Sequence, residues 1–348
     1  MMKSAFVLGG ILLLALGCAI AQEAPVSAHP AERSETTFRS SSNLVLVPVV
    51  ALKNGLPDKT LTRDDFQVLD NGRPVSIKTF DSGAQFSTRP LALWFVVQCN
   101  MEGWEKQGSG LFAGQIDRFK PALKDVDKQD AVAVAHWCDN GESKLDLRPT
   151  RNVEEATSTL EEILAHILAP FDHSRTGELA LQKTLQLIIN ETRSFKPERV
   201  PVVIFLYGDY SAMPKSEADH FVDELLETSA VAYGLKDRRS PKIRSFGEQG
   251  AVAKYIATET GGEYLQVTPE TYATRLGQIL QQLHGRYELG FKPETLDGKR
   301  HKLTVKLADA TKDQHKGVRL RYRLAYVPTR HDDSDRSGHQ GQPGETRK

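Results

Sequence analysis

The sequence has few cysteines, no excess of charge and no long apolar run beyond its first residues. Its 348 residues contain only three cysteines, which is too few for a disulfide-rich scaffold. Basic and acidic residues balance at 45 each, so the net charge favours neither nucleic acid nor an anionic membrane as a partner. After residue 21 no stretch reaches the roughly 18 to 20 apolar residues that a membrane-spanning helix needs.

Motifs of common enzyme and nucleotide sites are also missing. There is no Gly-x-x-x-x-Gly-Lys phosphate loop, no dinucleotide fingerprint and no Gly-x-Ser-x-Gly nucleophile elbow. Asp172, His173 and Ser174 have the residue types of a catalytic triad, but immediate neighbours in sequence rarely converge as triad residues do. We therefore expect a protein that is not an enzyme.

The first residues have the pattern of a signal peptide. Lys3 precedes an apolar stretch over residues 5–17, and Ala19-Ile20-Ala21 provides the small residues of a cleavage site. This pattern predicts an exported protein, periplasmic or extracellular. A competing interpretation is a lipoprotein anchored to a membrane through Cys18. Lipidation of Cys18 is the only route to a membrane that the sequence offers.

Residues 91–97 are seven consecutive apolar residues, followed by a polar cluster at Gln98, Asn100 and Glu102. A short apolar run of this kind is typical of a strand buried on both faces of a parallel sheet. From here strands alternate with amphipathic helices over residues 86–285, which predicts a Rossmann-like, doubly wound α/β domain. A hairpin signal at residues 139–141 predicts one antiparallel edge strand. Ligands of such sheets lie beyond the carboxyl ends of the strands, where the polar cluster falls.

Strand-like segments flank this domain on both sides, at residues 43–85 and 286–328. The first is too short to be stable alone, so we expect the two segments to pair in one β-sandwich. The sequence has no internal repeat of fixed period, which argues against a solenoid or a propeller. The remaining segments are predicted as a signal peptide (1–21), a flexible linker (22–42) and a disordered tail (329–348).

Three stretches carry a resemblance to a known family. They are LVLVPVV followed by LTRDDFQVLDNGRPVSI, then LALWFVVQCNMEG, and finally RYELGFKP with DGKRHKLTVKL. With the order of strands and helices, they resemble the von Willebrand factor type A domain. More narrowly, the chain is similar to the bacterial exported proteins called von Willebrand factor type A related, described mostly from Acidobacteria. The resemblance covers residues 43–328 and implies the α/β fold expected above.

The resemblance also implies a metal-ion-dependent adhesion site, in which an Asp-x-Ser-x-Ser loop and later Thr and Asp residues hold Mg²⁺. A hard cation of this kind takes oxygen ligands, and a partner's carboxylate can complete its shell. The matching positions here are Gln98, Asn100, Glu102, Thr176 and Asp209. Because the first carboxylate is replaced by a neutral amide, two alternatives remain. The site is either vestigial, without tight metal, or rebuilt for Mg²⁺ from the other four residues.

Cys99 and Cys138 fall at the carboxyl ends of strands that should be adjacent in this fold. A disulfide requires a Cα separation below about 7 Å, which sequence does not show, so a disulfide and two separate buried thiols both remain open. The run His136-Trp137-Cys138-Asp139 has no second Cys or His pair at zinc-site spacing. We therefore expect a strand end there, with Trp137 packed on a helix.

These observations favour an exported binding or adhesion-type protein that needs no cofactor other than Mg²⁺ at a rebuilt site. Its upper loops would contact a protein or a cell-envelope partner, through Gln98, Asn100, Glu102, Thr176 and Asp209. The alternative is a structural subunit of an envelope complex whose metal site is vestigial.

Overall fold

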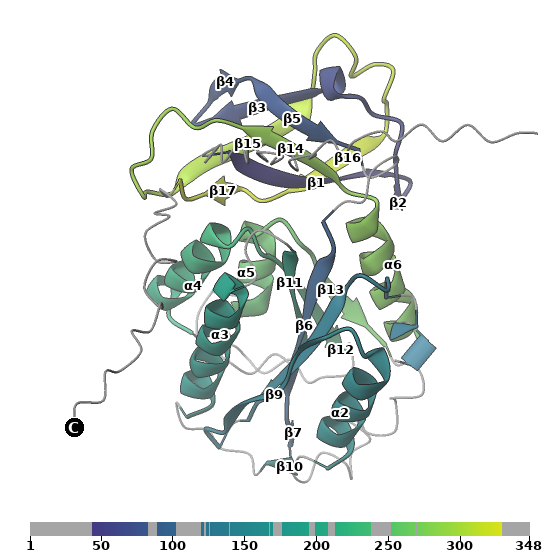
Figure 1. Cartoon of the computed structure of the whole chain (residues 1–348), viewed down its shortest axis with the longest axis vertical. Helices are drawn as coiled ribbons and strands as arrows, with labels where there is room; N and C mark the ends of the chain where they lie inside the picture. The colour runs from purple at the N-terminus through teal and green to yellow at the C-terminus, as the bar shows by residue number, and fades with distance from the viewer. Residues whose placement is uncertain are drawn as a thin grey trace, which may run out of the picture. The chain divides into compact units, whose positions relative to one another are not determined.

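The computed structural model describes residues 44–82, 89–101, 120–121, 123–124, 126–138, 140–166, 168–169, 176–194, 199–207, 213–237, 252–268 and 270–328. These residues form a six-stranded sheet covered by helices, two further sheets built from the segments on either side of it, and one short strand pair (Figure 1).

The central sheet has the strand order β13-β12-β11-β6-β8-β9. Its strands are β6 (Leu91–Gln98), β8 (Ala131–Trp137), β9 (Ser143–Thr150), β11 (Val200–Tyr207), β12 (Val231–Asp237) and β13 (Tyr264–Val267). All neighbours are parallel except β8 and β9, which are antiparallel. The prediction of a mostly parallel α/β sheet is confirmed, and β9 is the edge strand that the hairpin signal indicated.

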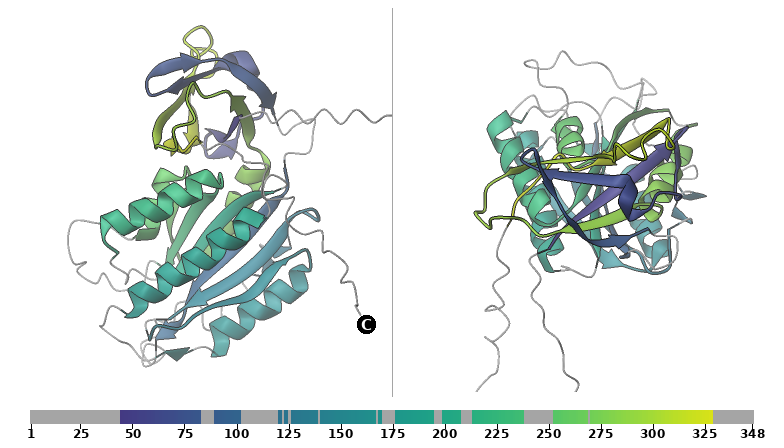
Figure 2. Two further views of the ribbon diagram at one scale, coloured as in Figure 1. Left: turned by 60° about the vertical axis from the view of Figure 1, so that its left-hand side comes forward. Right: turned by 90° about the horizontal axis from the view of Figure 1, so that it is seen from above.

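Helices cover both faces of this sheet (Figure 2). They are α2 (Val153–His166), α3 (Thr176–Ser194), α4 (Lys215–Glu227), α5 (Val252–Glu259) and α6 (Tyr272–His284). Leu93 and Phe95 of β6 pack in a core with α2 and α6, whereas Trp94 and Val96 pack in a second core with α3, α4 and α5. Because both faces are covered, every residue of β6 is buried. In the described part of the chain no helix is both long and apolar enough to cross a bilayer.

The segments before and after the α/β region complete each other's sheets. One sheet has the order β16-β1-β14-β5, with β2 paired to β1, and the other has the order β17-β15-β3-β4. In the first are β1 (Val45–Lys53), β2 (Leu56–Pro57), β5 (Ile77–Asp81), β14 (Tyr287–Phe291) and β16 (Val318–Tyr322). In the second are β3 (Phe66–Asp70), β4 (Arg73–Val75), β15 (His301–Leu307) and β17 (Ala325–Tyr326). The strand β1 lies between β14 and β16, and both sheets contribute to one core cluster.

A short 3-10 turn, η1 (Arg63–Asp65), leads into β3. The backbone N–H and the hydroxyl of Thr62 donate hydrogen bonds of 2.7 and 2.8 Å to Asp65 Oδ2, and His315 Nε2 lies 3.1 Å from Asp65 Oδ1. Burial alone would raise the pKa of the Asp65 carboxyl, but the Thr62 hydrogen bonds and the charge of His315 hold that pKa below its usual value. The turn before β3 is therefore fixed by its own carboxylate.

Two buried guanidinium groups bond to backbone oxygens of different elements. Arg323 donates to Leu226 O at the end of α4 (3.1 Å) and to Leu46 O in β1 (2.9 Å). Arg286 donates to Leu283 O and Arg89 O at 2.6 and 2.7 Å. Burial lowers the pKa of each guanidinium to about 10, which still leaves both charged at neutral pH. These residues join the flanking strands to the α/β region.

Candidate functional site

The direction of the chain across the central sheet reverses at β6. After β6 the chain forms β8 and the edge strand β9 on one side, and then returns to form β11 on the other side. The register places Gln98 beside Trp137, and Val97 beside Leu206, so the carboxyl ends of these three strands meet at one edge. A reversal of this kind is where open α/β sheets form their ligand crevices.

The structure describes the backbone of three of the five predicted site residues. Gln98 is the last residue of β6, Asn100 opens β7 (Asn100–Met101), and Thr176 is the first residue of α3. The side chain of Gln98 is buried. Glu102 and Asp209, and the side chains of Asn100 and Thr176, lie outside the described residues.

A short strand pair that the sequence does not predict joins the backbone of Asn100 to β10 (Leu168–Ala169). The strand β7 pairs in parallel with β10, with Asn100 opposite Leu168 (Figure 1). The segment that begins with β10 leads to Thr176. Each strand has only two residues, too few for a periodic pattern, so no signal in the sequence indicates this pairing.

Gln98, which stands at the position of the first metal-binding carboxylate, is the one residue of the predicted site whose side chain is described. Its amide oxygen is a hard donor, but it carries no charge where the family pattern has a carboxylate, and it is buried. Because the described residues provide no carboxylate at this position, no magnesium geometry follows from them.

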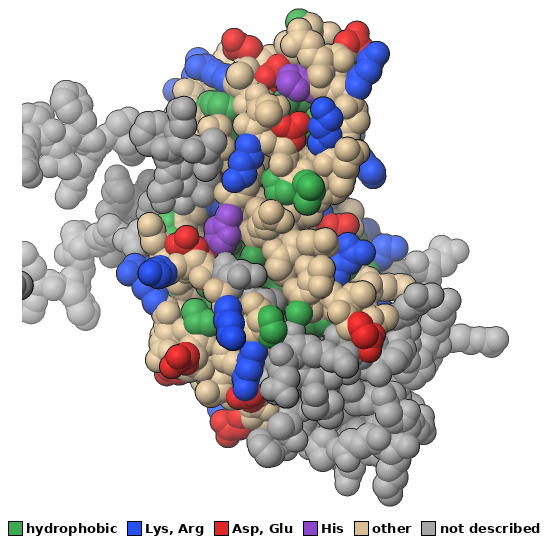
Figure 3. Space-filling view, turned by 90° about the vertical axis from the view of Figure 1, so that its right-hand side faces the viewer, with side chains coloured by type: hydrophobic (Ala, Val, Ile, Leu, Met, Phe, Trp, Pro, Cys, Tyr) green, Lys and Arg blue, Asp and Glu red, His purple; other side chains and the backbone are tan. Residues whose placement is uncertain are grey.

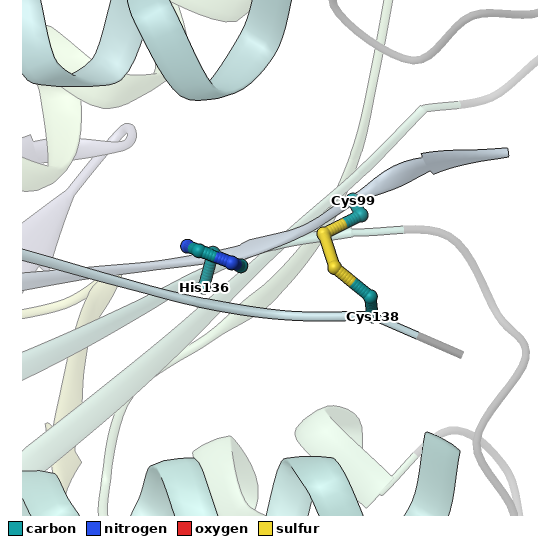
Figure 4. A group of neighbouring side chains, drawn as sticks. All are labelled: Cys99, His136 and Cys138. Atoms are coloured by element: carbon teal, nitrogen blue, oxygen red, sulfur yellow. A yellow bond between two sulfur atoms is a disulfide. The ribbon is translucent and has the colours of Figure 1, made fainter. Parts of the chain in front are cut away.

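The structure joins Cys99 and Cys138 by a disulfide at this edge (Figure 4). Their Cα atoms are 4.9 Å apart, within the range that disulfides require. The separation follows from the parallel pairing of β6 and β8, which continues as a 2.9 Å hydrogen bond from Cys99 N to Trp137 O. Both cysteines are buried. Of the two alternatives left open by the sequence, the structure contains the disulfide.

His136 lies on the same face of β8 as Cys138, because side chains two residues apart in a strand share a face (Figure 4). The ring is fully buried. Its Nδ1 lies 2.7 Å from Asp146 Oδ2; since an ionised carboxylate only accepts hydrogen bonds, Nδ1 carries the proton. Its Nε2 has no hydrogen-bond partner among the described residues, and Glu142 Oε1 lies 3.5 Å from it.

Two irregularities of the β8–β9 hairpin position these carboxylates. Val134 pairs with Leu147 while Ala135 pairs with Leu145, so Asp146 is the extra residue of a β-bulge. Bulges redirect side chains, and they are frequent next to functional sites. At the turn, Gly141 N donates to Cys138 O at 3.0 Å and Cys138 N donates to Glu142 O at 2.9 Å. This turn places Glu142 opposite Cys138.

The sequence places His136 and both cysteines near strand ends but does not predict that they meet, and it does not point to Glu142 or Asp146. The available signal was the alternation of His136 and Cys138 along one strand, next to a strand that ends at Cys99. The bulge that turns Asp146 has no such signal. Trp137, on the opposite face, packs in the core with α3 as expected.

A second buried histidine shows what a fully hydrogen-bonded ring looks like in this protein. His301 Nδ1 lies 3.0 Å from Asp70 Oδ1 and 3.1 Å from the Tyr326 hydroxyl, and its Nε2 lies 3.2 Å from Asp297 Oδ1. Burial, together with the hydrogen bond to Asp70, raises the pKa of Tyr326. Both ring nitrogens of His301 therefore have hydrogen-bond partners, whereas only Nδ1 of His136 has one among the described residues.

Charged side chains of both signs are interspersed on the face drawn in Figure 3. Ion pairs at the surface of the described chain include Arg193 with Glu224 and Arg300 with Asp223. A nucleic-acid site would instead gather basic residues in one stripe. The described residues of this face do not show such a stripe.

No protein-family model matches the sequence, and no curated protein matches it. Among solved structures, the chain is similar to a von Willebrand factor type A protein from Catenulispora acidiphila, with 11% identity, a TM-score of 0.43, and coverage of 83% of this chain and 75% of that chain. It is also similar to BatB from Bacteroides thetaiotaomicron, with 16% identity, a TM-score of 0.39, and coverage of 56% and 98%. An aerotolerance-related membrane protein from Bacteroides fragilis gives 16% identity, a TM-score of 0.38, and coverage of 55% and 99%.

Proposed function

We propose that this chain is an exported, non-enzymatic binding protein that contacts a protein or cell-envelope partner at the carboxyl edge of its central sheet. The observation that supports this proposal is the reversal of the chain at β6, which brings the ends of β6, β8 and β11 together. In the sequence, the predicted contact residues Asn100 and Glu102 follow β6, and Asp209 follows β11. Loops carried by a rigid sheet are where binding residues concentrate.

We further propose that the two flanking sheets form one β-sandwich. They share a core with Val49 of β1, Val68 of β3, Leu289 of β14 and Val305 of β15. In this proposal the sandwich supports the α/β domain, and the contact residues at the edge are Asn100, Glu102, Thr176 and Asp209 beside the buried Gln98. Residues 1–21 act as the signal peptide that directs export.

The test compares the two edges of the central sheet. A photo-crosslinking amino acid at position 102 samples the carboxyl edge, and the same group at exposed Lys128, just before β8, samples the opposite edge. In cells we expect a crosslinked partner from position 102 only, and its loss in the Asn100→Ala variant with unchanged thermal unfolding. Equal crosslinking from both positions, or no effect of Asn100→Ala, would favour the structural-subunit alternative.

Magnesium at this edge is a separate proposal, in which Glu102, Thr176 and Asp209 rebuild the metal site with Asn100. Titration calorimetry with Mg²⁺, Mn²⁺ and Ca²⁺ tests it. A rebuilt site predicts saturable binding that Glu102→Ala abolishes. Millimolar affinity that does not change in the Glu102→Ala variant would show that the site is vestigial.

A further inference from the structure

We propose that Cys99, Cys138 and His136, with Glu142 as the fourth ligand, bind one zinc-like divalent ion when the disulfide is reduced. The observations behind this proposal do not depend on the partner-binding function proposed above. It adds a second, oxidation-dependent site to the same end of the sheet.

The first support is the convergence of ligand atoms. One ligand atom each from Cys99, His136 and Cys138 lies within 4.8 Å of the others, and all three residues are buried (Figure 4). The carboxylate of Glu142 lies between two of them, 3.5 Å from His136 Nε2 and 3.9 Å from Cys138 Sγ. Ligand atoms on one tetrahedral zinc ion are about 3.3–3.8 Å apart, given metal–ligand bonds of about 2.0–2.3 Å. After reduction, the two sulfur atoms must move apart by side-chain rotation to reach this separation.

The second support is the state of the His136 ring. A metal-bound histidine usually donates its other N–H group to a carboxylate, which fixes the tautomer and orients the ring. Here Asp146 Oδ2 lies 2.7 Å from Nδ1 and can accept that hydrogen bond, so that Nε2 is the ring nitrogen that can bind an ion. A buried polar atom without a hydrogen bond costs free energy. Nε2 is such an atom among the described residues, and coordination of an ion would satisfy it.

The ligand set selects the ion. Two thiolates and an imidazole are soft or borderline donors that prefer Zn²⁺ to the hard ion Mg²⁺. The structure supplies these donors on the faces of β6 and β8 that carry Val97 and Val134. Strand alternation directs the side chain of Gln98 to the other face. The proposed zinc-type site and the predicted magnesium ligands therefore do not share side chains.

The switch between the two forms is a thiol–disulfide exchange. A dithiol reductant attacks one sulfur of the Cys99–Cys138 bond through its thiolate, and its second thiolate then closes an intramolecular disulfide. The reductant is oxidised, the protein disulfide is reduced, and two thiols are released. Binding of a divalent ion then displaces the two thiol protons. In the reverse exchange a small-molecule or protein disulfide is the oxidant: it accepts the two electrons and is reduced to two thiols, the bond between Cys99 and Cys138 forms again, and the ion loses two ligands and is released.

The experiment uses the full chain in a Cys18→Ser background, so that Cys99 and Cys138 are the only thiols. Half of the sample is reduced with a phosphine and freed of reductant under argon, and both halves are titrated with Co²⁺ and then Zn²⁺. We expect the reduced protein to bind one Co²⁺ per chain with thiolate-to-cobalt charge-transfer absorption, which Zn²⁺ then bleaches. The oxidised protein should bind none. Absence of this absorption in the reduced protein would overturn the proposal.

Variants separate the roles of the side chains. His136→Gln and Glu142→Gln each remove one ligand, and we expect at least tenfold weaker binding from each; Glu142 is half-exposed, so its variant carries little folding risk. Asp146→Asn should weaken binding about 10- to 100-fold while keeping the cobalt spectrum, because Asp146 is a positioning residue. The control is His220→Gln, an exposed histidine of α4. Equal binding by the Cys99→Ser, Cys138→Ser double variant would show adventitious metal and refute the site.

Discussion

Removal of the disulfide should lower stability by an amount that the closed loop sets. The proposed perturbation is the Cys99→Ala, Cys138→Ala double variant. Both residues are buried and the backbone pairing of β6 with β8 does not depend on their sulfur atoms. The native fold should therefore persist, and the change should arise mainly in the unfolded chain, which the crosslink no longer restricts.

The magnitude follows from the length of that loop. The two cysteines are 39 residues apart in sequence, and for a loop of this size the chain-entropy relation gives about 13 cal/mol/K, or about 4 kcal/mol at 25 °C. Typical measured values are about 2–4 kcal/mol. We therefore expect the free energy of unfolding to fall by about 2–4 kcal/mol. For a chain of this size that loss lowers the unfolding midpoint on the order of 5–10 °C.

Urea denaturation of four samples provides the assay: wild-type and double-variant protein, each with and without a phosphine reductant. Reduction should lower the stability of wild-type protein to nearly that of the variant, and should leave the variant unchanged. A loss below about 1 kcal/mol, or an equal effect of the reductant on both proteins, would refute the reasoning from loop closure. A reduced protein that stays folded is also the form to which metal is added in the titrations above.

Three further predictions concern the flanking sheets. Asp65→Asn should lower the free energy of unfolding by about 1–3 kcal/mol at pH 7. Because folding lowers the pKa of Asp65, the stabilisation by its carboxylate is complete above about pH 4 and disappears as the pH falls through the pKa of the folded state. The urea midpoints of this variant and of the exposed control Asp64→Asn should therefore converge in acid. Gly261→Ala should lower the free energy of unfolding by about 2–4 kcal/mol, since its φ of +84° is strained for alanine and the new Cβ would lie 2.3 Å from backbone atoms. The control Gly277→Ala has open space for its Cβ and should be neutral or stabilising in the same thermal unfolding experiment. Arg323→Lys should cost about 2–4 kcal/mol in thermal unfolding, because one ammonium cannot reach the oxygens that the guanidinium fork bonds; an unchanged melt would show that those bonds contribute little.

The sequence predicted the central sheet well because that sheet depends on local patterns. Residues 91–97 are apolar without a break, and the strand they form is buried on both faces. The hairpin residues Asn140 and Gly141 fixed the edge strand, and Gly141 has the positive φ of 95° that such a turn uses. Helices followed from spacings of three and four residues. Each of these signals lies within about fifteen residues of the structure it determines.

The site depends on contacts that no local pattern encodes. Asp146 lies at one of two register shifts between β8 and β9, and a bulge does not interrupt the alternation strongly enough to be recognised in a single sequence. Cys99 and Cys138 are close because β6 and β8 are parallel neighbours in register, which depends on the helices between them. The zinc-site rule applied to the sequence looked for ligand pairs close along the chain. That rule does not consider a set such as Cys99, His136 and Cys138, in which Cys99 comes from another strand.

The two chemistries proposed for this edge are separated by one residue. Gln98 and Trp137 are register neighbours, and Trp137 packs in the core of α3, while Cys99 and Cys138 are joined across the next position. Partner contacts at Asn100 and ion binding at the cysteines therefore use different side chains but the same backbone. Because Cys99 immediately precedes β7, the crosslink fixes the point from which Asn100 extends. The oxidation state of the two buried sulfur atoms would thus determine which ligands an ion finds here. It would also determine whether a crosslink fixes the backbone that carries Asn100 at the binding edge.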